Sequence, residues 1–327
     1  MITNINRRDF IKLTSLLFVG ASVSNRLFAE DIKSNVDINN LWSINGSNFH
    51  AIYDNPEQRL AFIGFLKNVF SIFPSEKFDG LIAEASMQET ADKFIYTAVQ
   101  DRLSSIKPIA SDVRYSLPAL YKQTSTIGKQ ILQLIGERKQ VDGYMEIGTK
   151  GGYLAFIDNS IKFGGDKVLL SDLPATYELG DIAERRGIKK IGRFVSLNSY
   201  APISEDAVKS QSLDVICNPI GFHHSPPEKR DAFVRSIRRC LRPGGKLIVR
   251  DHDVNHETMN HMVALAHDVF NMGLYHPWSY NCAEIRNFTS LDELRAYLTT
   301  FGFEPEQSCI YQDGDPTKNA LFSFVAV

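Results

Sequence analysis

The sequence predicts an α/β protein in which a mostly parallel sheet follows an α-helical N-terminal region. Up to about residue 138 the apolar residues recur at helical spacing, and from residue 141 short apolar runs alternate with helical segments. Strands that alternate with helices form a parallel sheet covered on both faces. The last two apolar runs flank a tight turn, which predicts a C-terminal hairpin that adds an antiparallel edge to the sheet.

The composition is that of an ordinary globular protein. At 327 residues the chain is long enough for about two domains, with 43% hydrophobic and 23% charged residues. A formal net charge of −2 gives no reason to expect nucleic acid as a partner. The four cysteines lack the spacing of a metal site, and Cys217 and Cys240 are expected to be buried as small hydrophobic side chains.

Residues 1–29 have the three parts of an export signal. Arg7, Arg8 and Lys12 precede an apolar run over residues 13–23, and Ala29 is the expected cleavage point. The apolar run is too short to span a bilayer as a stable helix. The pattern Arg-Arg-x-Phe-Ile-Lys resembles the twin-arginine signal, which implies the twin-arginine export machinery as a partner and an exported, periplasmic or extracytoplasmic, location. Anchoring to the membrane by an uncleaved signal is the alternative.

Residues 30–138 are expected to form the helical region. Asn55 is a suitable cap and Pro56 a suitable first residue for a helix that Pro74 ends. Further helices are expected near residues 78–82, 94–106 and 116–136. Their aromatic and aliphatic residues are interpreted as core rather than as a ligand site.

Residues 139–327 are expected to form the sheet domain. The predicted strands are 144–147, 168–171, 193–196, 213–218, 246–250, 307–311 and 321–327. Helices are predicted over residues 225–241, 256–272 and 291–301. Asn255 is the expected cap of the second of these helices, whose histidines are expected at the surface or behind the site.

A glycine-rich turn follows the first strand and reads Glu146-Ile-Gly148-Thr-Lys150-Gly-Gly152. Such a turn lets a ligand lie against bare backbone beside the positive end of a helix dipole. Asp172 ends the second strand, where a carboxylate can accept hydrogen bonds from both hydroxyls of a ribose. The same placement occurs in NAD-binding folds, so Asp172 alone does not choose the cofactor.

Together with Arg242-Pro-Gly-Gly245 before the fifth strand, these motifs resemble those of the class I S-adenosylmethionine-dependent methyltransferases over residues 141–327. The resemblance implies a Rossmann-like methyltransferase sheet and S-adenosylmethionine as cofactor. Glu146, Gly148 and Gly152 match the first motif of the family, whereas Lys150 stands in place of its middle glycine.

The resemblance also implies roles for three residues at the ends of later strands. Asp172 would bind the cofactor ribose, and Asn198 would bond the adenine amine. Asn218, in a stretch that resembles the fourth-strand motif of the family, would lie beside the cofactor.

Four titratable residues are the candidate catalytic groups. His223 and His224 follow the fourth strand, and Asp251 and His252 end the fifth, so all four are expected at the carboxyl edge where a substrate would bind. One of them could act as a general base, or Asp251, Asp253 and histidines could bind a divalent metal. A polar pocket without either role is the third interpretation, and no residue is assigned as a metal ligand.

The expected function is methyl transfer from S-adenosylmethionine to a small-molecule or lipid-like acceptor. A non-catalytic binding or scaffold protein on the same fold is one alternative, and a metal-dependent hydrolase that uses the edge formed by Asp251 and Asp253 is another. S-adenosylmethionine is made in the cytoplasm, whereas residues 1–29 resemble an export signal. The cofactor would therefore travel inside the folded protein, or the domain would stay inside on its anchor, or catalysis has been lost.

Overall fold

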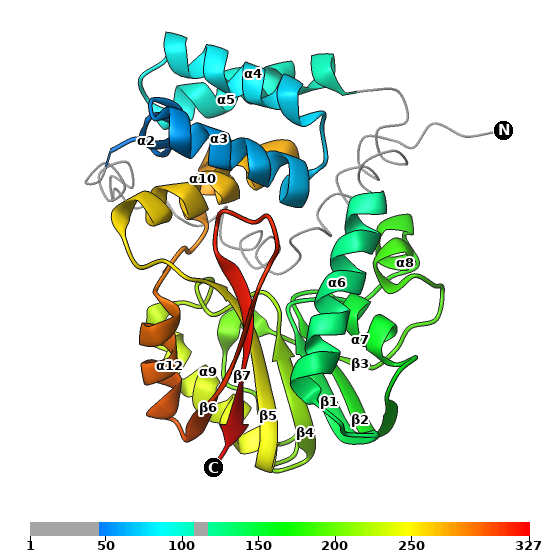
Figure 1. Ribbon diagram of the computed structural model, residues 1–327. Coiled ribbons are helices and arrows are strands. Elements are labelled where there is room, and N and C mark those ends of the chain that lie inside the picture. The colour runs from blue at the N-terminus through cyan, green and yellow to red at the C-terminus, as the bar shows by residue number, and fades with distance from the viewer. Residues whose placement is uncertain (1–45, 108–116) are drawn as a thin grey trace, which may run out of the picture.

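The computed structural model describes residues 46–107 and 117–327. Its centre is a seven-stranded sheet in the order β3-β2-β1-β4-β5-β7-β6. All neighbouring strands from β3 to β5 are parallel, and β7 runs antiparallel to both β5 and β6. The predicted fold class, a mostly parallel sheet with an antiparallel edge hairpin after a helical region, is confirmed (Figure 1).

The strands extend the apolar runs seen in the sequence. They are β1 (Gln140–Ile147), β2 (Lys162–Ser171), β3 (Arg193–Ser196), β4 (Leu213–Asn218), β5 (Leu241–His252), β6 (Phe303–Tyr311) and β7 (Asn319–Ala326). The central strands are buried on both faces, as is typical of parallel sheets. Cys217 in β4 and Cys240 at the end of α9 (Pro227–Cys240) are buried, as predicted.

Helices cover both faces of the sheet. Buried residues of α6 (Leu117–Ile135) and α7 (Gly152–Ile157) pack on one face. Residues of α9 and α12 (Leu291–Thr299) pack on the other. The short helix α8 (Leu179–Arg185) lies on the same side as α6 and α7 (Figure 1).

A separate helical layer lies beyond the carboxyl ends of the parallel strands (Figure 1). It contains α2 (Asn48–Tyr53), α3 (Pro56–Phe65), the π-helix η4 (Leu66–Phe70), α4 (Ser75–Gln88) and α5 (Asp92–Ile106). Helix α10 (Glu257–Gly273), which follows β5, completes the same apolar core, and the short α11 (Trp278–Ala283) adjoins it. The boundary near residue 138 stays a prediction, because α6 packs on the sheet and α10 packs in the helical layer.

The cap of α10 differs from the prediction, and one predicted segment cannot be compared with the structure. Helix α10 is capped by His256, whose Nδ1 accepts the amide of Met259 at 3.1 Å, so the prediction that Asn255 is the cap is wrong. The expected export signal lies outside the described residues. Among the helices of residues 46–107 and 117–327, none has both the length and the apolar character needed to cross a bilayer.

Candidate functional site

A glycine turn joins β1 to α7 at the carboxyl edge of the sheet. Gly148 and Gly151 have φ angles of 79° and 93°, which glycine adopts without steric cost. A Cβ at position 148 would lie 2.8 Å from Cγ1 of Ile220 and closer still to its Cδ1. The turn therefore requires glycine at position 148, and the Ile220 side chain lies directly against it.

The buried carboxylate of Glu146 holds this turn against α7. It accepts hydrogen bonds from the Leu154 amide at 2.7 Å, from the Tyr144 hydroxyl at 3.2 Å and from the Thr149 hydroxyl. Burial raises the pKa of Glu146, while these donors act in the opposite direction. The carboxylate lies at the positive end of α7, so Glu146 binds the start of that helix.

Lys150 turns toward α8. Its Nζ lies 2.8 Å from Oδ1 of Asp181, and its backbone amide donates to Oε1 of Glu184 at 3.1 Å. The Glu184 side chain also packs on Gly152, where a Cβ would lie 2.7 Å from its Cγ. Burial raises the pKa of Glu184 to about 7. The side chain that replaces the middle glycine of the motif is thus held by an ion pair with α8.

Asp172 directly follows β2 and presents a half-buried carboxylate. Among the described residues, no group donates a hydrogen bond to it. Burial raises the pKa of Asp172 to about 6. The carboxylate is therefore an acceptor that is available to a ligand with hydroxyl donors.

A left-handed turn follows β3. Asn198, Ser199 and Tyr200 in η6 (Asn198–Tyr200) have φ angles of 46°, 51° and 62°. Such backbone is strained for residues other than glycine and is concentrated at functional sites. The side chain of Asn198 is exposed at this edge, whereas Tyr200 is buried.

Asn218 ends β4 beside the glycine turn, because the register pairs Glu146 with Cys217. Its Nδ2 donates to the Gly221 carbonyl at 3.1 Å. Its Oδ1 is buried and has no hydrogen-bond partner in the described part of the chain. Buried polar atoms are nearly always paired, so this oxygen indicates that a ligand or water donates to it.

His223 and Asp251 form a buried pair across the ends of β4 and β5. His223 Nδ1 lies 2.5 Å from Asp251 Oδ1, and Asp251 Oδ2 accepts the amide of Phe222 at 2.8 Å. Burial would raise the pKa of Asp251, but His223 beside it lowers that pKa below its usual range. Gly221, with a φ of 79°, allows this approach, since a Cβ there would lie 2.7 Å from His223 Nδ1.

Four histidine rings gather at this point. His224, His252 and His267 lie with His223, and the ring centroids of His223 are 4.0, 5.4 and 5.4 Å from theirs. Burial lowers the pKa values of His224, His252 and His267, which favours the neutral imidazoles. Ligand atoms of His223, His252 and His267 lie within 4.8 Å of one another, as do those of His224, His267 and Glu284.

His267 corrects the prediction that the histidines of α10 lie at the surface or behind the site. It is 3% exposed and belongs to the cluster, and His261 on the same helix is 7% exposed. Seven of the eight histidines fall between residues 223 and 276, and for His267 this concentration was the one signal in the sequence.

Asp253 does not join Asp251 in a metal-binding edge. Its Oδ1 accepts the amide of Leu291 at 3.1 Å, and its Oδ2 accepts the hydroxyl of Tyr311 at 2.9 Å. Both oxygens are therefore engaged by α12 and β6. The interpretation that paired Asp251 with Asp253 is not supported by this arrangement.

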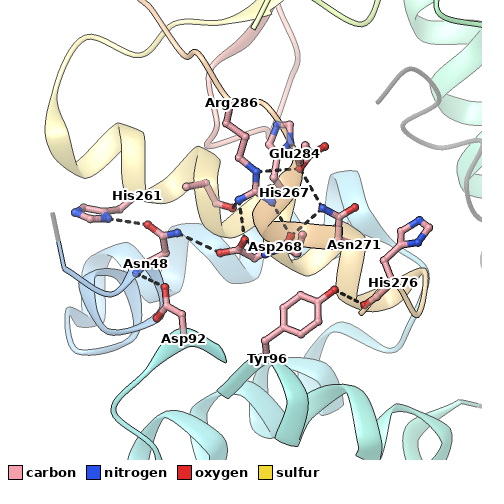
Figure 2. Close-up of polar contacts among 12 residues, drawn as sticks. Asn48, Asp92, Tyr96, His261, His267, Asp268, Asn271, His276, Glu284 and Arg286 are labelled. Carbon is pink, nitrogen blue, oxygen red and sulfur yellow. Dashed lines mark hydrogen bonds and ion pairs between the residues drawn. The ribbon is translucent and has the colours of Figure 1, made fainter. Parts of the chain in front are cut away.

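A buried polar network connects the histidine cluster to the helical layer (Figure 2). Arg286 binds Asp268 Oδ1 at 2.7 Å and Glu284 Oε2 at 2.9 Å. His267 Nδ1 lies 3.5 Å from the same oxygen of Glu284, and Asn48 in α2 donates to Asp268 at 3.2 Å. Sequence analysis missed Glu284 and Arg286, because neither lies in a recognisable motif.

Residues 194–249 match the family model described as Methyltransferase domain. The match runs from β3 through β4 and α9 into β5, so it includes Asn198, Asn218, His223 and His224. No curated protein matches the sequence.

Several solved structures are similar to this chain. Burkholderia thailandensis 1,6-didemethyltoxoflavin-N1-methyltransferase, with bound 1,6-didemethyltoxoflavin and S-adenosylhomocysteine, is 15% identical, with 73% of this chain and 92% of that chain covered and a TM-score of 0.41. The CurJ carbon methyltransferase is 14% identical, with 84% of this chain and 71% of that chain covered and a TM-score of 0.46. A geranyl diphosphate methyltransferase in complex with GPP and sinefungin is 13% identical, with 62% of this chain and 78% of that chain covered and a TM-score of 0.43. With TM-scores below 0.5, these likenesses carry no conclusion about activity or ligand.

Proposed function

We propose that the chain is an S-adenosylmethionine-dependent methyltransferase that acts on a small-molecule or lipid-like acceptor. The match of residues 194–249 to the Methyltransferase domain model is the observation that carries this proposal. The mostly parallel sheet with an antiparallel C-terminal hairpin is the architecture expected over residues 141–327, and it supports the proposal.

The residues at the carboxyl edge fit the proposed cofactor. Asp172 offers a carboxylate with no donor among the described residues, and Asn218 offers a buried oxygen that lacks a partner. The glycine turn at Gly148 lies between the strands that carry them. When bound, S-adenosylmethionine supplies a methyl group on a sulfonium. Asp172 would hold the ribose hydroxyls, and Oδ1 of Asn218 would accept a hydrogen bond from the cofactor. Asn198 would contact the adenine from the left-handed turn after β3.

The acceptor would lie next to the histidine cluster. His223 and His224 follow β4, and Asp251 and His252 end the neighbouring strand β5. The helical layer covers this end of the sheet (Figure 1). In this position the four residues would orient the acceptor and exclude water, which is the main contribution an enzyme makes to an in-line methyl transfer. We propose no nucleic-acid partner.

Transfer of a labelled methyl group tests this function. The full chain is incubated with methyl-labelled S-adenosylmethionine and cell extracts separated into aqueous small molecules and lipids. We expect label in one of these fractions with the native chain and little with Asp172→Asn. Binding of the cofactor without any labelled product would favour the scaffold alternative.

We also propose that residues 1–29 direct the protein to the twin-arginine machinery, so that it is exported or held at the membrane. The test is a fusion to a reporter that is active only outside the cytoplasm. Export should disappear when Arg7 and Arg8 are both changed to Lys. Reporter activity that is unaffected by this double change would contradict the twin-arginine route.

A further inference from the structure

We propose that His223, His252 and His267 form a binding site for a divalent transition metal, with zinc as the best match. The three side chains come from the β4–α9 loop, the end of β5 and the middle of α10. All are buried, with exposures of 5%, 2% and 3%. This site differs from the edge of Asp251 and Asp253 considered from the sequence.

The three rings surround a common point. Their centroids are 5.4 Å apart for His223 and His252, 5.4 Å for His223 and His267, and 5.8 Å for His252 and His267. One ligand atom of each lies within 4.8 Å of the other two. In a tetrahedral site with Zn–N bonds of about 2.0–2.1 Å the nitrogens are about 3.3 Å apart. An approach of at most about 1.5 Å would therefore close the site.

The Nδ1 atoms are held from outside the cluster. Asp251 Oδ1 lies 2.5 Å from Nδ1 of His223, and the Thr317 carbonyl oxygen lies 2.9 Å from Nδ1 of His252. Glu284 Oε2 lies 3.5 Å from Nδ1 of His267. A carboxylate or carbonyl bonded to Nδ1–H is the usual outer shell of a metal-binding histidine. For His223 and His252 these short contacts fix the proton on Nδ1 and leave the lone pair of Nε2 for the metal, and Glu284 lies on the corresponding side of His267.

The Nε2 atoms of His223 and His252 have poor alternatives to a metal. That of His223 is buried and lacks a hydrogen-bond partner among the described residues. That of His252 has the Nδ2 of Asn319 at 3.4 Å, which is long for a hydrogen bond. Imidazoles that carry their protons on Nδ1 cannot donate to one another through Nε2, so a cation satisfies these lone pairs better than the rings themselves can.

The donor set indicates the class of metal. Three neutral imidazoles suit zinc and its neighbours among the divalent transition metals, whereas calcium and magnesium prefer oxygen ligands. Three histidines also leave a fourth position open, as in catalytic zinc sites. Glu284 is assigned here as an outer partner of His267 through its Oε2, which also binds Arg286 at 2.9 Å and Asn271 at 3.0 Å.

Convergence of three histidines favours a metal over a general base, since proton removal needs only one imidazole beside the acceptor. The site stands independently of methyl transfer, so its test does not depend on the cofactor.

His224 lies against the three histidines, with its ring centroid 4.0 Å from that of His223 and 5.3 Å from that of His267. Its Nδ1 is 3.2 Å from the Ile285 carbonyl.

The test measures metal content and the cobalt spectrum of the full chain without a histidine tag. After removal of metal with a chelator and dialysis against zinc, we expect about one zinc ion per chain, and the cobalt form should show the strong visible absorption of a four-coordinate site. His252→Asn and His267→Asn should abolish uptake. His256→Asn is the matched control, because His256 lies outside the cluster and Asn preserves the cap of α10.

Asp251→Asn keeps the three ligands and should weaken zinc affinity about 10- to 100-fold by loosening the hold on His223. Circular dichroism checks that each variant is folded. If the variants of the ligands do not fold, the cobalt spectrum of the native chain alone decides whether the site binds metal. Folded native chain without bound zinc and without the cobalt absorption would overturn the proposal. Equal metal loss in His256→Asn and His252→Asn would also overturn it.

Discussion

Replacement of Arg286 by methionine should destabilise the connection between the histidine cluster and the helical layer. Arg286 is 7% exposed in its side chain and binds Asp268, which is 1% exposed, and Glu284, which is 7% exposed. It also donates to Oδ1 of Asn281 at 2.6 Å. The substitution keeps most of the side-chain volume but leaves two buried carboxylates without their cation.

Removal of one partner from a buried ion pair costs about 3–5 kcal/mol, and we expect a loss of this size in the free energy of unfolding. The loss should depend on pH. In the native protein burial would raise the pKa of Glu284, but Arg286 and His267 hold it well below its usual range. Its contribution is therefore present above the unfolded pKa of about 4.3 and is lost as the pH falls.

In the Arg286→Met variant the pH dependence of the contribution of Glu284 to stability reverses, because burial without the arginine raises the pKa of this carboxyl group and favours its protonated form. The variant should therefore lose more stability, relative to the native protein, at pH 8 than at pH 5. Urea unfolding at the two pH values, followed by circular dichroism and by tryptophan fluorescence, measures this difference in stability. Trp278 is a suitable probe because its ring centroid lies 5.2 Å from that of Tyr96, beside the network.

Arg193→Met is the matched control, because the Arg193–Asp166 pair has the same chemistry but side-chain exposures of 44% and 38%. An exposed pair contributes about 0–1 kcal/mol. Equal losses in the Arg286→Met and Arg193→Met variants would refute the conclusion that the buried network stabilises this region.

Three further predictions concern the carboxyl edge of the sheet. Gly148→Ala should lower the free energy of unfolding by about 1–3 kcal/mol in urea titrations, since the φ of 79° and the Ile220 side chain both oppose a Cβ. Ser199→Gly should raise it by about 0.5–1 kcal/mol in the same assay by relieving a φ of 51°. With a pKa of about 6, Asp172 goes from about one-tenth to about nine-tenths ionised between pH 5 and pH 7, so S-adenosylmethionine affinity by calorimetry should rise up to about tenfold, and Asp172→Asn should abolish this dependence.

The sheet was predictable where apolar side chains mark the strands. Strands β3 and β4 have the bounds predicted from their apolar runs. Strand β1 begins earlier than predicted, because Gln140 and Asp142 pair with β2 through the backbone, which a side-chain pattern does not report. Helix α3 continues into the π-helix η4, and this change of helix type has no marker in the spacing of apolar residues.

The histidine cluster was predictable only in part. His223, His224 and His252 follow strands whose carboxyl ends meet at one edge, so the topology brings them together. His267 was placed outside the site because α10 was treated as a helix with one buried face. The structure buries every residue from His261 to Gly273, since α10 packs both in the helical layer and over the sheet edge.

Calorimetric titration of the full chain with S-adenosylmethionine and with NAD decides which cofactor, if either, binds at the carboxyl edge of the sheet. We predict that S-adenosylmethionine binds with a Kd on the order of micromolar, that Asp172→Asn weakens this binding, and that NAD does not bind. Binding of NAD instead, or no binding of either ligand, would contradict the claim that the carboxyl edge around Gly148 and Asp172 is an S-adenosylmethionine site.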